Sequence, residues 1–407
     1  MGGQVSLALV LLVASGLMVR SFQKLRVVDP GFDATSALTF RVGLPDRDYP
    51  NRGAAVAAHQ AILDRLSALP GVTAVSASTC LPLADEGYCF GNMLQVRGRD
   101  TQDGKISPPA GFRAVAGGFV EAMGIRLLGG RSIDRGDVER GEPVAVVNQA
   151  LVNAYFPNQD PIGERVASAL GLVADRSSAQ NPSWLTIVGV VSNTPVLALA
   201  EANPLPLLYM PMSIAGGPGM SQLAGPNVAM MSYVVRAATS PPGLLPSVRG
   251  AVDAIDAKLA LAQVRTLQDT LDRASAQMAF TMVLLAIAAG VALMLGVIGI
   301  YGVMSYIVSQ RTGEIGVRLA LGAEPSSVAG MIVRQGGFVS LAGTMVGLAS
   351  AFAGSRFIES LLYGLSPRDP GVFAATTLTL LAVALLACWL PARRAARLSP
   401  VEALRAN

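Results

Sequence analysis

Side chains that commonly perform catalysis or bind metals are scarce in this chain of 407 residues. It has one histidine, His59, and three cysteines, Cys80, Cys89 and Cys388. Zinc and haem sites usually need several His or Cys ligands, so this count argues against both. His59 falls in a predicted helix, where a surface or packing role is the simpler interpretation. No set of residues converges on a reaction, and we predict that the chain is not an enzyme.

Two acidic clusters and one glycine-rich stretch remain as candidates for a binding site. Asp85-Glu86 and residues 134–137 lie in turn-rich chain, where we expect solvated loops in preference to metal ligands. The stretch 215–219 is rich in glycine but contains no lysine, and no Gly-x-x-x-x-Gly-Lys-Ser/Thr motif occurs in the chain. The chain therefore lacks a phosphate-binding loop of that type, and we predict no cofactor or metal of its own.

Cys80 and Cys89 are candidates for a disulfide. They bracket Pro82 and Gly87 in a part of the chain that is predicted below to face outward. An oxidising compartment would permit the bond, but spacing alone does not establish the geometry that a disulfide needs. Both the bonded and the free state stay open. Cys388 falls in an apolar run and is expected to act as a small apolar residue.

The apolar composition indicates a membrane protein. Hydrophobic residues make up 52% of the chain and charged residues 14%, with a mean hydropathy of +0.48, which is too apolar for an ordinary soluble enzyme. The net charge of +4 is small and comes mostly from arginines beside apolar runs, so nucleic acid is not an indicated partner. Four uncharged runs are long enough for the roughly 20 residues that cross a bilayer. They comprise residues 1–19, 279–308, 335–355 and 370–392.

The first run has a second interpretation, as a signal peptide. Signal peptides start with basic residues and end at a small-residue cleavage site followed by polar chain, and residues 1–26 lack this pattern. We therefore predict an uncleaved first span that continues into a stalk up to residue 26.

Residues 27–266 have the Pro- and Gly-rich character of a soluble domain with both helices and strands. Near each end of this region, the apolar pattern predicts a strand, a helix and a strand in that order. These βαβ units comprise residues 37–44, 54–69 and 72–78, and then 231–237, 244–259 and 261–267. Together they predict one split subdomain built from both ends, with an inserted subdomain at about 80–228.

The inserted part has buried strands of its own at 143–147, 184–191 and 207–212. Asn148 can cap the helix that ends at Phe156. After the last strand, residues 267–278 continue a helical period into the second span without a breaker, which predicts a stalk. The expected fold is therefore four transmembrane helices with a large extracytoplasmic α/β (α+β) domain between the first and second helices.

The distribution of Lys and Arg in short loops predicts the orientation. Seven arginines lie between the second and third spans or after the fourth, against two between the third and fourth. The seven are Arg311, Arg318, Arg334, Arg393, Arg394, Arg397 and Arg405, and the two are Arg356 and Arg368. This count places both termini, the loop 311–323 and the tail 393–407 in the cytoplasm.

Three basic residues disagree with this orientation. Arg20, Lys24 and Arg26 flank the first span on its predicted outer side. Either translocation of the long domain overrides their charge, or Met1 is not the natural start and a preceding segment is missing. We prefer the second explanation.

The sharpest signal is the amphipathic segment that directly follows the second span, Arg311-Thr-Gly-Glu-Ile-Gly-Val-Arg-Leu-Ala-Leu-Gly-Ala323. Glu314 and Arg318 stand four positions apart, a pairing that stabilises a short helix in water. The apolar side that a partner's pocket would accept comprises Ile315, Leu319 and Leu321. The alternative is an ordinary interfacial helix at the lipid headgroups. The residues alone leave both interpretations open.

This segment resembles the cytoplasmic coupling helix of MacB/FtsX-type ABC transporter permeases, in which R-x-x-E-I-G-x-R-x-A-L-G-A follows the second span. Similar motifs occur over almost the whole chain. Residues 27–32, 68–72, 123–131, 143–148, 156–163 and 187–191 resemble the MacB-like periplasmic core domain, and 391–405 resembles the C-terminal tail of the family. These motifs are specific only collectively. They are most similar to one half of the duplicated permeases of acidobacteria. A preceding half would explain why no basic residue stands before the first predicted span.

The resemblance implies a non-catalytic permease subunit of the bacterial inner membrane. A separate cytoplasmic ATPase would bind the ATP and dock on the coupling helix, and the second span would transmit its motion to the outer domain in an efflux or export-type function. The implied docking residues are Arg311, Gly313, Glu314, Ile315, Gly316, Arg318, Leu319, Leu321 and Gly322. The implied partners are this ATPase, the lipid bilayer, a second permease half or a second copy of the chain, and a periplasmic protein.

A second hypothesis comes from another functional class. The chain would be a membrane-anchored scaffold or sensor whose outer domain binds a partner protein without an ATPase. A Walker-motif ATPase encoded beside it would argue against this hypothesis, and a neighbouring kinase or hydrolase would argue for it.

Overall fold

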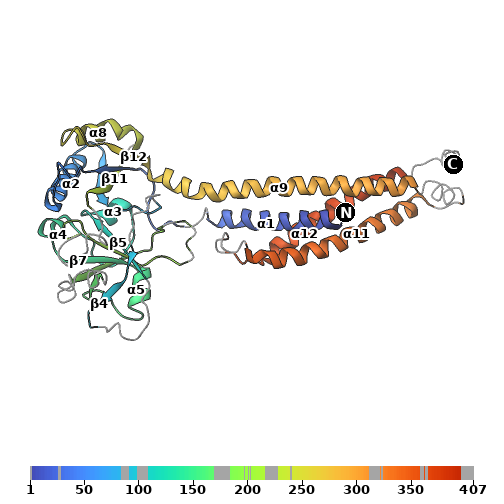
Figure 1. Ribbon diagram of the computed structural model, residues 1–407, viewed down its shortest axis with the longest axis horizontal. Coiled ribbons are helices and arrows are strands. Elements are labelled where there is room, and N and C mark those ends of the chain that lie inside the picture. Colours follow the sequence, from blue (N-terminus) through green and yellow to red (C-terminus); the bar gives the residue numbers. More distant parts are fainter. Residues whose placement is uncertain are drawn as a thin grey trace. The chain divides into compact units, whose positions relative to one another are not determined.

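The computed structural model forms two units, Val28–Ser275 and Met1–Val27 with Ala276–Asn407 (Figure 1). The first unit contains a large β-sheet, and the second contains long apolar helices. The structure describes residues 2–25, 29–83, 91–98, 109–168, 184–196, 198–199, 201, 203–215, 228–238, 241–310, 321, 324–357, 362 and 365–395.

Four strands from the two ends of the first unit are neighbours in its sheet. They are β1 (Ala37–Gly43), β2 (Val72–Ser78), β11 (Met230–Ala237) and β12 (Leu261–Thr266). Their order is β12-β1-β11-β2, and each neighbouring pair is antiparallel. The connections are α2 (Arg52–Ser67) after β1, and η2 (Pro241–Leu244) with α8 (Leu245–Asp253) after β11. Both predicted βαβ units are therefore present, and their strands alternate across the sheet.

The remaining strands extend the same sheet in the order β5-β10-β7-β9-β8-β4, while β3 pairs with β5 and β6 pairs with β9. Their bounds are β3 (Gly91–Asn92), β4 (Leu94–Val96), β5 (Ala110–Val115), β6 (Leu127–Gly130), β7 (Val144–Asn148), β8 (Arg165–Ser168), β9 (Leu185–Val191) and β10 (Leu207–Pro211). Only the β5–β10 and β7–β9 pairs are parallel among the described strands. A single residue pair, Ser78 with Val115, joins β2 to β5. The predicted split and inserted parts therefore meet in one mixed sheet, and their division into two subdomains stays a prediction.

Three short helices complete this unit: α3 (Phe119–Met123), α4 (Arg135–Arg140) and α5 (Gln149–Tyr155). The Asn148 side chain accepts a hydrogen bond of 3.0 Å from the backbone N–H of Leu151 at the start of α5. The predicted cap is therefore confirmed, and the cap satisfies one of the N–H groups that the first turn of a helix leaves without a partner.

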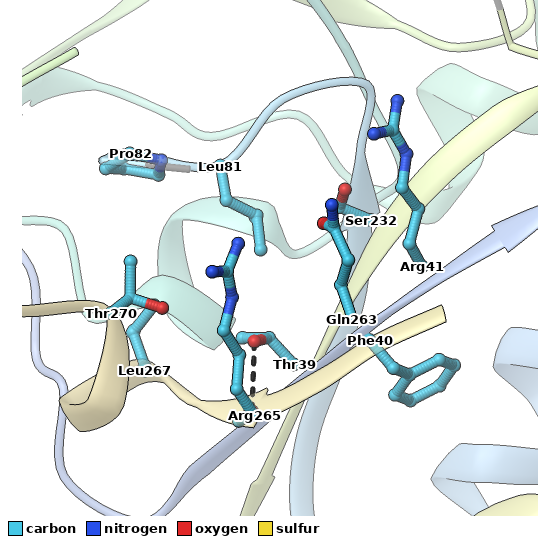
Figure 2. Close-up of a pocket in the computed structure, with 10 residues that line it drawn as sticks. All are labelled: Thr39, Phe40, Arg41, Leu81, Pro82, Ser232, Gln263, Arg265, Leu267 and Thr270. Atoms are coloured by element: carbon cyan, nitrogen blue, oxygen red, sulfur yellow. Dashed lines mark hydrogen bonds between the residues drawn. The ribbon is translucent and has the colours of Figure 1, made fainter. Parts of the chain in front are cut away.

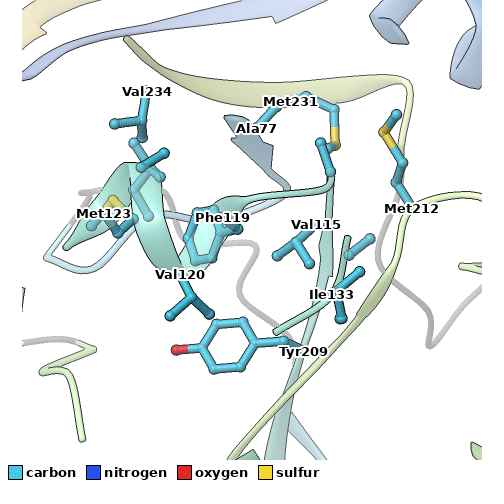
Figure 3. Close-up of a cluster of buried hydrophobic side chains, with 14 of the residues drawn as sticks. Ala77, Val115, Phe119, Val120, Met123, Ile133, Tyr209, Met212, Met231 and Val234 are labelled. Carbon is cyan, nitrogen blue, oxygen red and sulfur yellow. The ribbon is translucent and has the colours of Figure 1, made fainter. Parts of the chain in front are cut away.

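The two faces of the β1–β11 region carry different side chains. Phe40 stacks on Tyr233 with ring centroids 5.1 Å apart, on the face that α2 covers. Because successive side chains of a strand point to opposite faces, Thr39 and Arg41 lie on the other face. Figure 3 shows α3 beside this part of the sheet, with Phe119 and Val120 above Tyr209, and the Phe119 and Tyr209 centroids lie 5.8 Å apart.

His59 is fully buried between α2 and β11, which confirms the packing interpretation. Its Nε2 lies 2.8 Å from the carbonyl oxygen of Val228, and its Nδ1 lies 2.6 Å from the Tyr233 hydroxyl. A carbonyl can only accept, so Nε2 carries the proton and Nδ1 of the neutral ring accepts from Tyr233. Burial lowers the pKa of His59 to about 4, although the bond to Val228 opposes the shift.

We expect the outer domain to lose stability as the pH falls from about 6.5 to about 4. In this window the unfolded chain protonates His59, whose ordinary pKa is about 6.5, while the folded chain keeps the ring neutral. The loss amounts to about 3 kcal/mol, since each pKa unit corresponds to about 1.4 kcal/mol. Hydrogen–deuterium exchange of α2 and β11 across this range measures the change.

The matched variant for this prediction is His59→Gln, which keeps a hydrogen-bonding side chain but cannot titrate. It is expected to be less stable at neutral pH and to lose most of the dependence on pH between 6.5 and 4. An unchanged pH dependence in His59→Gln would contradict the prediction. Carboxylates with a lowered pKa, such as Asp137, lose their contribution to stability from about pH 5 downward, but they do so equally in the unchanged chain and in His59→Gln, so the difference between the two chains isolates His59.

The second unit contains four long helices among its described residues, α1 (Gly2–Leu25), α9 (Leu267–Gln310, whose first turns belong to the first unit), α11 (Pro325–Gly354) and α12 (Pro370–Ala395). Three of their segments are long and apolar enough to cross a membrane: Gly3–Lys24, Leu267–Gln310 and Pro370–Arg393. α11 covers the predicted third span, and several of its side chains lie outside the described residues. The count of four spans therefore stays a prediction.

The helices of this unit share an apolar core. Leu9 and Leu17 of α1 are fully buried, and they belong to one cluster with Met304 of α9, Ala351 of α11 and Cys388 of α12. Cys388 is a free thiol, in line with its expected role as a small apolar residue.

Candidate functional site

Only a small part of the predicted coupling helix lies among the described residues. α9 ends at Gln310 and α11 begins at Pro325, and the Leu321 side chain between them is 83% exposed. The other predicted docking residues lie outside the described residues. They are Arg311, Gly313, Glu314, Ile315, Gly316, Arg318, Leu319 and Gly322. Their role stays a prediction.

Cys80 is buried after the end of β2 and takes part in a disulfide. Its predicted partner Cys89 lies outside the described residues, as do Asp85 and Glu86. The pairing of Cys80 with Cys89 therefore stays a prediction.

The acidic cluster 134–137 has structural partners. Asp134 and Asp137 form a reciprocal capping box at the start of α4. Both Asp137 oxygens also accept hydrogen bonds from the Arg131 guanidinium, at 2.6 and 3.0 Å. Burial would raise the pKa of Asp137, but the bonds from Arg131 and the Asp134 N–H lower it below its usual range. These carboxylates therefore serve to hold α4 in place, and the expectation of solvated side chains is wrong for Asp137.

The segments that lead toward α1 and into α9 leave the sheet from adjacent strands. β1 begins at Ala37, β12 ends at Thr266, and Leu38 pairs with Thr266 across the ladder. α9 starts directly after β12 with a second reciprocal cap, in which the Asp269 carboxylate accepts from the Thr266 N–H and the Thr266 hydroxyl accepts from the Asp269 N–H. The segment that comes from α1 and the segment that enters α9 therefore both meet the sheet at its β12 edge.

A second contact holds the segment before β1 against the centre of the sheet. The Arg236 guanidinium donates to the Asp33 carboxylate at 2.7 Å and to the backbone oxygens of Asp33, Thr35 and Ala122. The Arg236 side chain is 15% exposed. Four acceptors on two segments make Arg236, itself in β11, a polar link between α3, β11 and the approach to β1. Sequence reasoning missed this residue, because a single arginine in a strand carries no local signal.

Comparison with known protein families identifies both parts of the chain. The model of the MacB-like periplasmic core domain matches residues 5–255, and the model of the FtsX-like permease C-terminal domain matches residues 286–400. The chain belongs to the MacB-type ABC transporter permease family. The resemblance inferred from the sequence motifs is therefore confirmed.

Curated relatives of this MacB-type permease include two kinds of protein. This chain is 29% identical to the macrolide export ATP-binding/permease protein MacB 2 of Aeromonas hydrophila, over 71% of this chain and 42% of that protein. It is 22% identical to the uncharacterized ABC transporter permease YknZ of Bacillus subtilis over 71% of this chain and 68% of that protein. The chain spans about two fifths of the length of the MacB relatives. A crystal structure of the periplasmic region of MacB from Actinobacillus actinomycetemcomitans covers 62% of this chain and 97% of that one, with 17% identity and a TM-score of 0.38.

Within the helical unit of the permease, Arg20 pairs with Asp369. The Arg20 guanidinium lies 2.5 Å from an Asp369 carboxylate oxygen, which also accepts from the Val372 N–H at the start of α12. The C-terminal end of α1 and the N-terminal end of α12 therefore lie together. One of the three basic residues that disagree with the predicted orientation therefore has a negative partner within the helical unit.

Asp369→Asn is expected to keep the cap of α12 and to lose the ion pair. Because Arg20 is half exposed, the expected loss of stability is at most about 1 kcal/mol and shrinks at high salt. Asp369→Ala should cost about 1 kcal/mol more, since it also removes the cap. Thermal unfolding of the full chain in detergent, at low and high salt, measures both. Equal effects of the two substitutions would contradict the assignment of the cap.

Proposed function

We propose that this chain is the permease subunit of an ABC transporter and that it transmits the motion of a separate cytoplasmic ATPase to its outer domain. The observation that supports this most directly is α9. This helix of 44 residues starts at the end of β12 and ends where the amphipathic segment 311–323 begins. At 1.5 Å per residue it is about 66 Å long, roughly twice the thickness of the hydrocarbon core of a bilayer. One continuous element thus serves as span and stalk.

In this proposal each part of the chain has one role. The segment 311–323 is cytoplasmic and docks the ATPase, which binds the ATP, so the permease itself needs no cofactor and performs no chemistry. Four spans hold it in the bacterial inner membrane with both termini inside and the sheet domain outside. The names of its MacB relatives, which are export proteins, support an export direction. Two permease halves, as a homodimer or as parts of one longer chain, would act together and contact a periplasmic partner.

Replacing residues 313–321 with a Gly/Ser linker of equal length tests the docking role. We expect the variant to insert in the membrane and to lose association with a co-expressed ABC ATPase that co-purifies with the unchanged chain. A control with Arg393 and Arg394 changed to Gln, which alters the charge elsewhere on the predicted cytoplasmic side, is expected to retain the ATPase.

Undiminished association in the linker variant would refute the docking role. If no ATPase associates with the unchanged chain either, the alternative of an anchored scaffold or sensor is favoured. A pull-down with the outer domain intact then asks whether that domain holds a partner protein by itself.

A further inference from the structure

α9 leaves the outer domain at the β12 edge of the sheet, where it is held by the two end strands. Figure 2 shows the small pocket at this place, which is lined by Thr39 and Arg41 of β1, Arg265 of β12, and Leu267 and Thr270 of α9, among others. The Thr39 hydroxyl donates to the Arg265 carbonyl oxygen at 3.0 Å, which links β1 to β12. A movement of α9 would therefore reach β12 and β1 first.

The strap (residues 29–36) is the segment that directly precedes β1. It ends close to the start of α9, because Leu38 of β1 pairs with Thr266, the residue before α9. Besides the bonds from Arg236, the strap has a backbone bond of its own. The Asp33 N–H donates to the carbonyl oxygen at the end of α3, that of Met123, at 3.0 Å. The strap therefore joins α3 to the place where α9 leaves the sheet.

The closest approach of the strap to the inserted part is at Gly31. Its φ of 74° lies in the left-handed region, and a Cβ at this position would overlap the carbonyl oxygen of Asn193. Glycine is therefore needed for the two backbones to lie so close. Asn193 follows β9, and its side-chain oxygen accepts from the Ala150 N–H in the first turn of α5, at 2.7 Å. Through Asn193 the strap reaches the end of β9 and the start of α5.

The strap also bridges the two groups of strands in the sheet. The groups meet at β2 and β5, which share the single residue pair Ser78 with Val115, whereas β1 and β11 share seven pairs. Fewer hydrogen bonds oppose a relative movement where the pairing is short. Arg236 belongs to one group, and Met123 and Asn193 belong to the inserted sequence of the other. The strap contacts both, so it couples them independently of the β2–β5 pairing.

We propose that the strap relays the movement of α9 from the β12 edge to α3, the end of β9 and the start of α5. Gly31 and Arg236 are its positioning residues, since they hold the strap on Asn193 and on β11. The inference rests on the proposed function, because it needs an ATPase that moves α9. It adds that the inserted part of the outer domain, and not only the β12 edge, responds to the nucleotide.

The test follows hydrogen–deuterium exchange of α5 and of β12 in the full chain, in nanodiscs with the associated ATPase. Exchange is compared between the ADP state and a non-hydrolysable ATP analogue. In the unchanged chain, both elements should differ between the two states. Gly31→Ala pushes the strap off Asn193, so the difference at α5 should be lost while the difference at β12 remains. A merely structural role of Gly31 would change the exchange of α5 equally in both states and leave the difference in place.

Gly141→Ala is the matched control for the backbone. Gly141 has a similar φ of 62°, and its added Cβ would meet no atom of the described residues within 4 Å. It should keep both responses. Arg236→Gln is a second variant, which leaves Gly31 intact and decides the question if Gly31→Ala does not fold. It should weaken the difference at α5, and Arg249→Gln on the exposed side of α8 is its charge control.

Three outcomes would contradict the relay. A full difference at α5 in folded Gly31→Ala would overturn it, and so would a response of β12 without a response of α5 in the unchanged chain. If neither element of the unchanged chain responds although the ATPase is bound, the proposed transmission itself is contradicted, and the relay falls with it. The response of β12 thus separates a failure of the relay from a failure of the proposed function.

Discussion

Replacing Ser275 by proline is expected to leave the ATPase bound and to abolish the response of the outer domain to nucleotide. Ser275 lies inside α9, where its hydroxyl donates to the Leu271 carbonyl oxygen at 3.0 Å. Proline has no backbone N–H and its ring clashes with the carbonyl four residues earlier, so it kinks or breaks a helix at a cost of about 3 kcal/mol or more. If α9 transmits motion, a break on the outer side of the span interrupts it.

Hydrogen–deuterium exchange of Leu261–Thr266 measures this response, with the associated ATPase in its ADP state and with a non-hydrolysable ATP analogue. The unchanged chain should show a difference between the two states, and Ser275→Pro should show none. The control is Ser275→Ala, which removes the same hydroxyl but keeps the helix, and it should respond normally. A normal response in the proline variant would mean that α9 is not the transmitting element, even if the ATPase docks as proposed.

Gly189→Ala is expected to destabilise the outer domain by about 2–3 kcal/mol, through overpacking between strands. A Cβ at Gly189 would lie 2.1 Å from the carbonyl oxygen of Arg131, which is backbone and cannot rotate away. The adjacent hydrogen bond from the Arg131 N–H to the Val188 carbonyl oxygen, 2.9 Å long, would have to lengthen as the end of β6 moves off β9.

Gly43→Ala is the matched control, because it is also a glycine in a strand. Its added Cβ would meet only the flexible end of Met230, at 3.8 Å. Thermal unfolding of the full chain in detergent should therefore show a clear decrease for Gly189→Ala and little change for Gly43→Ala. A small effect of Gly189→Ala would mean that β6 can separate from β9 without loss of stability. The pairing of β6 with β9 would then add little to the stability of the outer domain.

The strands at both ends of the outer domain were predictable from local patterns. β1, β2, β11 and β12 begin and end within about two residues of their predicted limits. Their apolar alternation and the turn residues beside them are local properties, and so is the Asn148 cap. The amphipathic segment 311–323 stands out for the same reason, although only the comparisons with known families decide which family it belongs to.

Strands with weaker local patterns were not predicted. β5 is buried along its whole length but contains Arg113, whose side chain is only 2% exposed. The arginine lies in the field of Glu201 and beside Tyr209, which come from distant parts of the chain. β6 has two exposed leucines followed by two glycines, which is the opposite of a buried strand pattern. Long-range pairing stabilises both strands, and a local pattern does not report it.

By itself, the sequence indicated a membrane protein with a large Pro- and Gly-rich domain and an amphipathic segment directly after a long apolar run. These conclusions depend on composition and short-range spacing, which neighbouring residues set. Only the tertiary structure decided that β1 and β12 are adjacent, with Arg41 and Arg265 in one pocket beside the start of α9. Their strands lie at opposite ends of the domain sequence, and only strand pairing, register and one bulge bring both residues to the lining of one pocket.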